Sequence, residues 1–175
     1  MKRVLITGMS GAGKSAVVGA LRARGYRAFD ADVDGLSEVA AVDGDATTGI
    51  GGGRDWVWRL DRIREVLAAH PADLVFLAGC SPNQGQLYPL FDHVVLLSLP
   101  PDVLAHRLAT RVTNPFGKDP GELARTLELC ETVEPLLRAG ATLEIDSRTP
   151  LDEVVARILD HVGPAAPPRS RSPTG

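Results

Sequence analysis

One short stretch, GMSGAGKS at residues 8–15, limits the possible folds of this chain more than any other. It fits the pattern GxxxxGK[ST], in which glycines let backbone N–H groups turn towards a phosphate. In this pattern the lysine, here Lys14, reaches the outer phosphate oxygens, and the hydroxyl of Ser15 binds Mg²⁺. The pattern indicates a phosphate-binding loop only when a strand precedes it and a helix follows it, so the neighbouring residues must be checked for both.

Both neighbours have the required character. KRVLIT at residues 2–7 is a short apolar run typical of a buried parallel strand. KSAVVGALRARG at residues 14–25 has apolar residues at helical spacing and ends at a glycine. A helix that begins at a glycine loop directs its N-terminal N–H groups and dipole at an anion. The residues expected to hold the phosphates are Gly8, Gly11, Ala12, Gly13, Lys14, Ser15 and Ala16.

Strand and helix patterns alternate along the rest of the chain. We expect strands at residues 26–31, 72–79, 93–99 and 141–146, and helices at residues 35–42, 56–70, 101–111, 120–140 and 150–162. A flexible loop is expected at residues 43–53. Five strands interleaved with helices predict an α/β fold, a five-stranded parallel sheet with helices on both faces.

Composition bounds the domain organisation and the partners. The 175 residues are 44% hydrophobic, which suits one globular domain at residues 1–162. The proline- and serine-rich tail at residues 163–175 is expected to be disordered. A net charge of −3 favours neither nucleic acid nor an acidic membrane as a partner.

The expected location is the cytoplasm. The two cysteines, Cys80 and Cys130, are far apart and lack metal-binding spacing, which suits a reducing compartment. The N-terminus enters a strand directly, with no signal-peptide pattern, and no apolar run approaches membrane-spanning length. A monomer and a homodimer both remain open.

Two aspartates follow the second expected strand, in FDAD at residues 29–32. Asp30 and Asp32 occupy alternate positions at the strand end, so both carboxylates are expected on one face. Topology puts this end beside the glycine loop, at the sheet edge where open α/β proteins bind ligands. The alternative is an acidic turn that caps the next helix.

With these motifs the chain resembles the P-loop small-molecule and nucleotide kinases, such as shikimate kinase, gluconate kinase, dephospho-CoA kinase and adenylate kinase. The resemblance covers residues 1–162 in the order of elements, and its sharp motifs are GMSGAGKS, the D-x-D and HRLATR at residues 106–111. GCSPNQG, NPFGK and TVEPLLRAGATLEID also resemble small predicted kinase-like ATP-binding proteins of uncertain substrate. The resemblance implies the P-loop kinase fold with a short lid, and ATP with Mg²⁺.

The resemblance also implies roles for the carboxylates and the lid. Asp30 would steady water on Mg²⁺, and Asp32 would hold the acceptor hydroxyl and take its proton, with Asp34 as a further candidate. HRLATRVTNPFGK reads as the helix end and lid, the lid itself at about residues 112–120. Arg111 would neutralise the phosphoryl group in transit and Arg107 would contact the nucleotide, with Lys118 as a helper. A solvated basic helix end is the alternative.

Two further loops are expected at the same sheet edge. In LAGCSPNQG, Gly79 permits a close backbone approach to a ligand, and Asn83 and Gln84 can bind hydroxyl groups. Cys80 is expected beside the acceptor. A nucleophilic cysteine would need a partner histidine, and none is evident, so Cys80 is expected to be a small buried residue. In DSRTP, Arg148 and Pro150 lie where such kinases pack the adenine ring.

The acceptor region is expected at about residues 33–70. Trp56, Trp58, Arg59 and Arg62 would form the pocket, with the tryptophans as a stacking wall for a ring-bearing acceptor. Packing of the tryptophans in the core, covered by arginine, is the alternative.

These features predict an ATP- and Mg²⁺-dependent kinase that phosphorylates a small hydroxyl-bearing molecule. Shikimate kinases hold a carboxylate with several arginines, one of them shortly before the last strand, whereas this chain reads ETVEPLL there. A nucleotide kinase with a phosphate acceptor and an ATP-binding regulatory switch with slow hydrolysis are the alternatives. The acceptor itself is not indicated.

Overall fold

Five parallel strands form the central sheet of the protein, whose computed structural model describes residues 1–42, 52–69, 74–112 and 116–163. The strands lie in the order β2-β5-β1-β6-β7. They are β1 (Lys2–Thr7), β2 (Arg27–Asp30), β5 (Leu74–Ala78), β6 (His93–Ser98) and β7 (Leu143–Asp146). β1 is in the middle because its residues are hydrogen-bonded to β5 on one side and β6 on the other. The predicted α/β fold class is confirmed.

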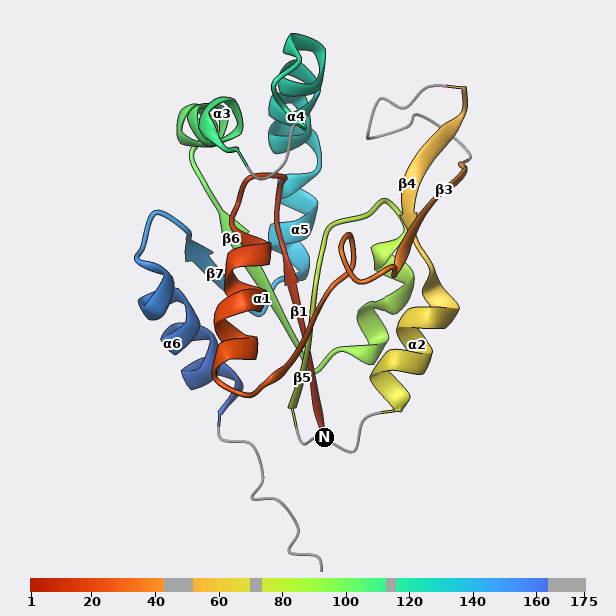
Figure 1. Cartoon of the computed structure of the whole chain (residues 1–175), viewed down its shortest axis with the longest axis vertical. Helices are drawn as coiled ribbons and strands as arrows, with labels where there is room; N and C mark the ends of the chain where they lie inside the picture. The colour runs from red at the N-terminus through yellow and green to blue at the C-terminus, as the bar shows by residue number, and fades with distance from the viewer. Residues whose placement is uncertain (43–51, 70–73, 113–115, 164–175) are drawn as a thin grey trace, which may run out of the picture.

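Helices cover both faces of the sheet (Figure 1). Alternate residues of β1 point to opposite faces. Val4 and Ile6 pack in a core with α1 (Lys14–Ala23) and α6 (Leu151–Val162). Leu5 packs in a second core with α2 (Leu60–Ala68) and the 3₁₀ helix η1 (Gln84–Leu90).

A third apolar cluster supports the carboxyl end of the sheet. Met9 and Leu96 pack there against α3 (Pro101–Thr110) and α5 (Glu134–Gly140). Together with α4 (Pro120–Thr132), α3 rises beyond the ends of the strands (Figure 1). The Asp119 side chain begins α4 by accepting hydrogen bonds from the N–H groups of Gly121 and Glu122, as an N-cap does.

A β-hairpin stands at the same end, opposite α3 and α4 (Figure 1). Its antiparallel strands are β3 (Ser37–Ala41) and β4 (Arg54–Trp58). The predicted helix at residues 35–42 is therefore wrong. The predicted helix at residues 56–70 begins only at Leu60.

The hairpin forms because an isolated helix of eight residues is marginal, and strand pairing offers these backbones regular hydrogen bonds. Val39 lies opposite Trp56, a β-branched and aromatic pair of the kind that stabilises sheets. Two short runs around a glycine-rich segment were the signal for a hairpin in the sequence.

The helix predicted at residues 120–140 is divided in two. α4 ends at Thr132 and α5 starts at Glu134, with Pro135 in its first turn. A proline has no N–H to donate to the carbonyl four residues earlier, and its ring crowds that carbonyl, so a continuous helix is interrupted there.

Parts of five predicted segments lie outside the described residues. They are residues 43–51 of the flexible loop, residue 70 of the helix expected at 56–70, residues 72–73 of the strand expected at 72–79, residues 113–115 of the lid and residues 164–175 of the tail. Within the described part of the chain, no helix combines the length and apolar character needed to cross a bilayer.

Candidate nucleotide and acceptor site

The glycine loop joins β1 to α1 in a conformation that only glycine adopts easily. Gly13 has a φ of +95° and directly precedes α1. A Cβ atom at Gly8 would lie 2.3 Å from the carbonyl oxygen of Leu97, so a side chain has no room there. The N–H groups of the first turn of α1 have no acceptor within their own helix, which leaves them available to an anion.

Lys14 lies across the mouth of this loop. Its Nζ donates to the carbonyl oxygens of Gly8 at 2.7 Å and Met9 at 3.0 Å. The ammonium group is therefore held inside the loop, where a phosphate would meet it.

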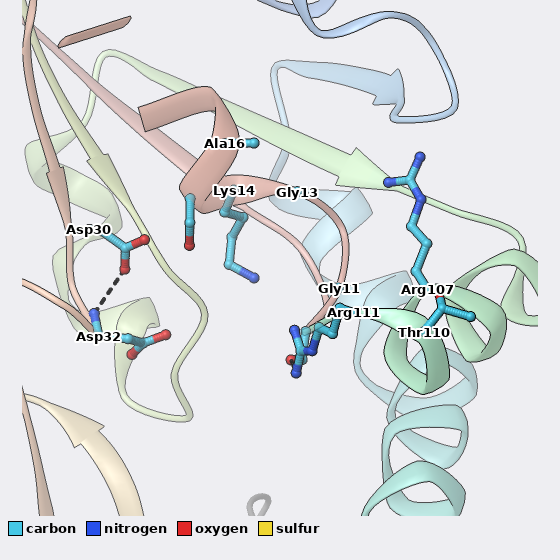
Figure 2. A pocket seen from close by; sticks show the side chains of 11 residues that line it. Gly11, Gly13, Lys14, Ala16, Asp30, Asp32, Arg107, Thr110 and Arg111 are labelled. Atoms are coloured by element: carbon cyan, nitrogen blue, oxygen red, sulfur yellow. Dashed lines mark hydrogen bonds between the residues drawn. The ribbon is translucent and has the colours of Figure 1, made fainter. Parts of the chain in front are cut away.

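A cavity of about 440 Å³, here called the cradle cavity, opens at the loop. Its lining comes from the loop and the start of α1, from the end of β2 and from α3. The lining residues are Ser10, Gly11, Gly13, Lys14, Ser15, Ala16, Asp30, Asp32, Arg107, Thr110 and Arg111. Figure 2 shows Asp30 and Asp32 on one side of Lys14, and Arg107 and Arg111 on the other.

The two carboxylates differ in exposure. Asp30 is buried and its Oδ1 accepts the N–H of Asp32 at 3.1 Å. Asp32 is exposed to the cavity, and its Oδ1 accepts the indole N–H of Trp56 at 2.8 Å. The sequence predicted both carboxylates at this edge and Trp56 in the acceptor pocket, but not the hydrogen bond between Trp56 and Asp32.

Asp34 lies outside the cavity lining. Its carboxylate is paired with Arg22 of α1 and accepts the backbone N–H of Asp30. Arg22 also donates to the carbonyl oxygen of Ala28 at 2.8 Å. Asp34 therefore fixes the turn that carries Asp30 and Asp32.

Arg107 of α3 and Arg111, the residue directly after α3, line the cradle cavity, and each is held by a backbone carbonyl. Arg107 donates to the carbonyl oxygen of Ser147 at 2.7 Å. Arg111 donates to the carbonyl oxygen of Phe116 at 2.6 Å and to Oγ of Ser10 at 3.3 Å. Burial lowers the pKa of Arg111, which stays a cation at neutral pH. Lys118 is exposed and outside the lining.

A smaller cavity of about 180 Å³ lies behind the loop, and we call it the Ser147 cavity. Its lining includes Ala12, Arg107, Ser147 and Thr149. The predicted adenine contacts Arg148 and Pro150 are neighbours in sequence but not part of this lining. Arg148 is exposed and paired with Asp146, whose pKa it lowers to about 2, while Pro150 is the residue before α6.

The third cavity, of about 500 Å³, adjoins the cradle cavity and shares Ser10 with it. We call it the apolar cavity. Its lining residues are Met9, Ser10, Trp56, Cys80, Ser81, Pro82, Gln84, Gly85, Tyr88, Phe116, Thr126, Leu129, Val133, Leu136 and Leu137. Three residues of the expected acceptor site, Trp56, Cys80 and Gln84, are brought together here.

Three other expected residues, Trp58, Gly79 and Asn83, stabilise the fold beside the apolar cavity. Trp58 is buried in the core, 2% exposed, and a Cβ at Gly79 would come within 2.9 Å of its ring. Gly79 therefore makes room for Trp58 rather than lining a cavity. Asn83 donates to the carbonyl oxygen of Trp58 at 2.9 Å and accepts its N–H at 3.0 Å, which ties η1 to the hairpin.

Arg59 and Arg62 lie outside the lining of both large cavities. Arg59 is 3.7 Å from a carboxylate oxygen of Glu38, and Arg62 is paired with Glu65 along α2. The two arginines do not lie on one helix, since Arg59 precedes α2 and only Arg62 belongs to it.

Several lining residues were not predicted. Ser10 and Thr110 complete the cradle cavity, and Tyr88 and Phe116 add aromatic surface to the apolar cavity. One signal was present in the sequence. Apolar residues at helical spacing in TLELCETVEPLL form a stripe along α4 and α5, and part of that stripe lines the apolar cavity.

A family model described as an AAA domain matches residues 4–128, more than half of the chain. The chain belongs to this AAA domain family. The matched residues 4–128 include every residue that lines the cradle cavity, from the glycine loop to Arg111.

Solved structures resemble this AAA domain protein over nearly its whole length. The shikimate kinase from Acinetobacter baumannii, solved with shikimate, has a TM-score of 0.59 at 20% identity and covers 93% of both chains. A sugar kinase from Janibacter sp. HTCC2649 has a TM-score of 0.55 at 18% identity and covers 93% of this chain and 94% of its own. A gluconokinase from Sinorhizobium meliloti 1021 has a TM-score of 0.51 at 21% identity, with 92% and 91% covered.

At such identities the likeness establishes the fold of the AAA domain protein, that of the P-loop kinases. The expected resemblance is thereby confirmed at this level. No match was found among curated proteins.

Proposed function

We propose that the protein is an ATP- and Mg²⁺-dependent phosphotransferase that acts on the hydroxyl group of a small molecule. One observation carries the proposal: a glycine loop with its lysine, two carboxylates and two arginines all line a single cavity. Phosphoryl transfer depends mainly on positioning and on neutralising phosphate charge, and these groups suit both tasks.

The cationic side of the cavity would hold the nucleotide. Lys14 lies in the loop, and the first turn of α1 supplies N–H groups for the phosphates. Arg111 reaches the cavity from the C-terminal end of α3, where its guanidinium would meet charge on the phosphoryl group in transit. Arg107 lines both the cradle cavity and the Ser147 cavity, so it would contact the nucleotide between phosphates and base.

Ser15 and Asp30 fit a magnesium ion bound together with nucleotide. Both line the cradle cavity, and oxygen ligands are those that Mg²⁺ prefers. No group of three or more His, Cys, Asp or Glu side chains suited to a metal occurs in the described residues. The ion would accordingly depend on nucleotide phosphates and water for most of its ligands, as Mg²⁺ commonly does. When bound it would neutralise part of the phosphate charge.

Asp32 is the candidate base. It is exposed to the cavity, across from Arg111, and a hydroxyl acceptor must lose a proton when it is phosphorylated. The solved structures with this fold include proteins named for shikimate and sugars, and a hydroxyl-bearing acceptor is of the same general kind.

A screen of acceptors for ADP release tests this function. Wild-type protein with ATP and Mg²⁺ should release ADP much faster with some hydroxyl-bearing acceptor than without any. The Lys14→Ala variant should lose this activity while its circular dichroism spectrum is unchanged. Arg64→Ala is the control, because Arg64 is an exposed residue of α2 outside the lining of both cavities.

Two results would contradict the proposal. Turnover that responds only to nucleoside monophosphates would indicate a nucleotide kinase. Slow hydrolysis that no acceptor accelerates would indicate a regulatory switch.

A further inference from the structure

The apolar cavity is the natural place for the body of an acceptor, because it continues from the cradle cavity. Ser10 lines both cavities. Trp56 lines the apolar cavity while its indole N–H binds Asp32, which lines the cradle cavity. A molecule whose hydroxyl group reaches Asp32 would therefore have its remaining atoms against Trp56.

The lining of the apolar cavity contains no Asp, Glu, Lys, Arg or His among the described residues. Its two ionisable groups are neutral at physiological pH, since burial raises the pKa of the Cys80 thiol and of the Tyr88 phenol. The nearby carboxylate of Glu134 is held by Arg138 at 2.7 Å. The cations Lys14 and Arg111 line the cradle cavity instead, although Arg111 binds Ser10 and Phe116 of this lining. A charged group packed against Trp56 and Tyr88 would find no opposite charge in the lining itself.

The polar groups in the lining are largely occupied with one another. Gln84 is buried, and its Oε1 accepts from Thr7 and from the N–H of Ser81, each at 3.3 Å. Its Nε2 donates to the Tyr88 hydroxyl at 3.1 Å. These bonds leave carbon-rich surfaces, including the ring of Tyr88, to face the cavity.

We propose that this cavity selects an uncharged, largely apolar alcohol, with a ring that packs between Trp56 and the stripe on α4 and α5. The inference rests on the proposed function for the fate of the hydroxyl group, but not for binding. A carboxylate or phosphate packed against these apolar walls would lose its hydration without a cation in the lining to replace it, which is unfavourable. Aromatic walls favour a ring through offset or edge contacts.

The rim supports the same occupant. Leu136 lines the cavity, yet 70% of its surface is exposed. An apolar ligand would cover part of that surface and gain from its burial.

Binding of a matched pair of probes tests the inference. Para-methylbenzyl alcohol and para-(hydroxymethyl)benzoate differ in one methyl-to-carboxylate change. Saturation-transfer NMR titration of the full chain, without ATP, should show at least about tenfold tighter binding of the neutral probe. Naphthalenemethanol, a larger neutral probe, should compete with it.

The Leu136→Lys variant places a cation at the rim, where the exposed side chain leaves little risk to folding. It should weaken binding of the neutral probe and strengthen binding of the carboxylate severalfold. Ala139→Lys is the matched control, because Ala139 is an exposed residue of α5 outside the lining. The control should leave both affinities unchanged.

The outcomes separate this inference from the proposed function. Equal or tighter binding of the carboxylate by wild type, or no binding of either neutral probe, overturns the inference whatever the ADP assay shows. Tighter binding of the neutral probe by wild type, weakened in Leu136→Lys, supports the inference. This holds even if no acceptor stimulates ADP release and the phosphotransferase proposal is wrong. Rapid ADP release with charged acceptors alone would support the phosphotransferase and overturn the inference.

Discussion

The indole N–H of Trp56 donates to Oδ1 of Asp32 at 2.8 Å, across 24 positions of sequence. This bond joins the hairpin to the turn after β2 and marks the boundary between the cradle cavity and the apolar cavity. It also orients the carboxylate that we propose as the base. In the proposed reaction, this geometry would couple acceptor recognition on the tryptophan side to proton removal on the aspartate side.

Replacing Asp32 by asparagine separates its charge from its position. An amide oxygen can still accept the Trp56 N–H, so the side chain should stay in place. Acceptor-dependent turnover should fall by about 10²–10⁴-fold, because a positioned base is lost. ATP affinity, measured by titration, should change little. Near-full turnover in Asp32→Asn would exclude Asp32 as the base.

Asp30→Asn is the companion variant at the neighbouring carboxylate. The Mg²⁺ concentration needed for half-maximal nucleotide binding should rise, since the buried Asp30 is expected to steady water around the ion. If Asp32→Asn raises the Mg²⁺ requirement and Asp30→Asn does not, the two roles are exchanged.

Arg111 and Arg107 should differ in what they contribute. Arg111→Ala should lower turnover by roughly a thousandfold with a small change in ATP affinity, because its charge is needed once the phosphoryl group is moving. Arg107→Ala should mainly weaken ATP binding, since Arg107 lies between the loop and Ser147. Steady-state kinetics with separate nucleotide titrations would distinguish them. A loss of affinity alone in Arg111→Ala would make it a ground-state contact.

Gly79→Ala should destabilise the fold. The new Cβ would lie 2.9 Å from the Trp58 ring and 3.1 Å from the Cβ of Ala31. Overpacking of this kind costs about 1–3 kcal/mol in the free energy of unfolding. Gly19→Ala in α1 is the control, since nothing lies within 4 Å of its Cβ position. It should stabilise by about 0.5–1 kcal/mol. Chemical denaturation curves measure both, and equal stabilities would contradict the packing described for Trp58.

Stability should fall as the pH is lowered through the histidine range. The pKa of His93 is below its ordinary value of 6.5, because of burial and because His161 and Lys2 disfavour the cation. Above pH 6.5 the neutral form prevails in both states, so His93 has no effect. Below pH 6.5 His93 binds a proton more readily in the unfolded chain than in the folded protein, so the free energy of unfolding decreases.

Thermal melts at pH values of about 7.5 and 5.5 would measure this loss. His93→Gln should reduce it, and His106→Gln, at an exposed position of α3, should not. An identical loss in wild type and His93→Gln would exclude His93 as its source.

The sequence by itself determined the glycine loop, the strand before it and the helix after it. These features are local, since positive φ angles, a helix start and a buried strand depend on consecutive residues. The parallel sheet followed as well, because alternating strand and helix patterns leave few ways to bury both faces. The positions of Asp30, Asp32, Arg107 and Arg111 in the cradle cavity follow from the ends of those elements.

Only the tertiary structure decided which side chains line the apolar cavity and which stabilise the core. Trp56 and Trp58 are two residues apart in one strand, yet one borders a cavity and the other is buried against Gly79. Residues 37–41 became a strand because β4, the next strand in sequence, paired with them, and this pairing outweighed their local helical pattern. The walls of the apolar cavity come from the hairpin, η1, α4 and α5, and contacts between such distant segments depend on packing that no local pattern specifies.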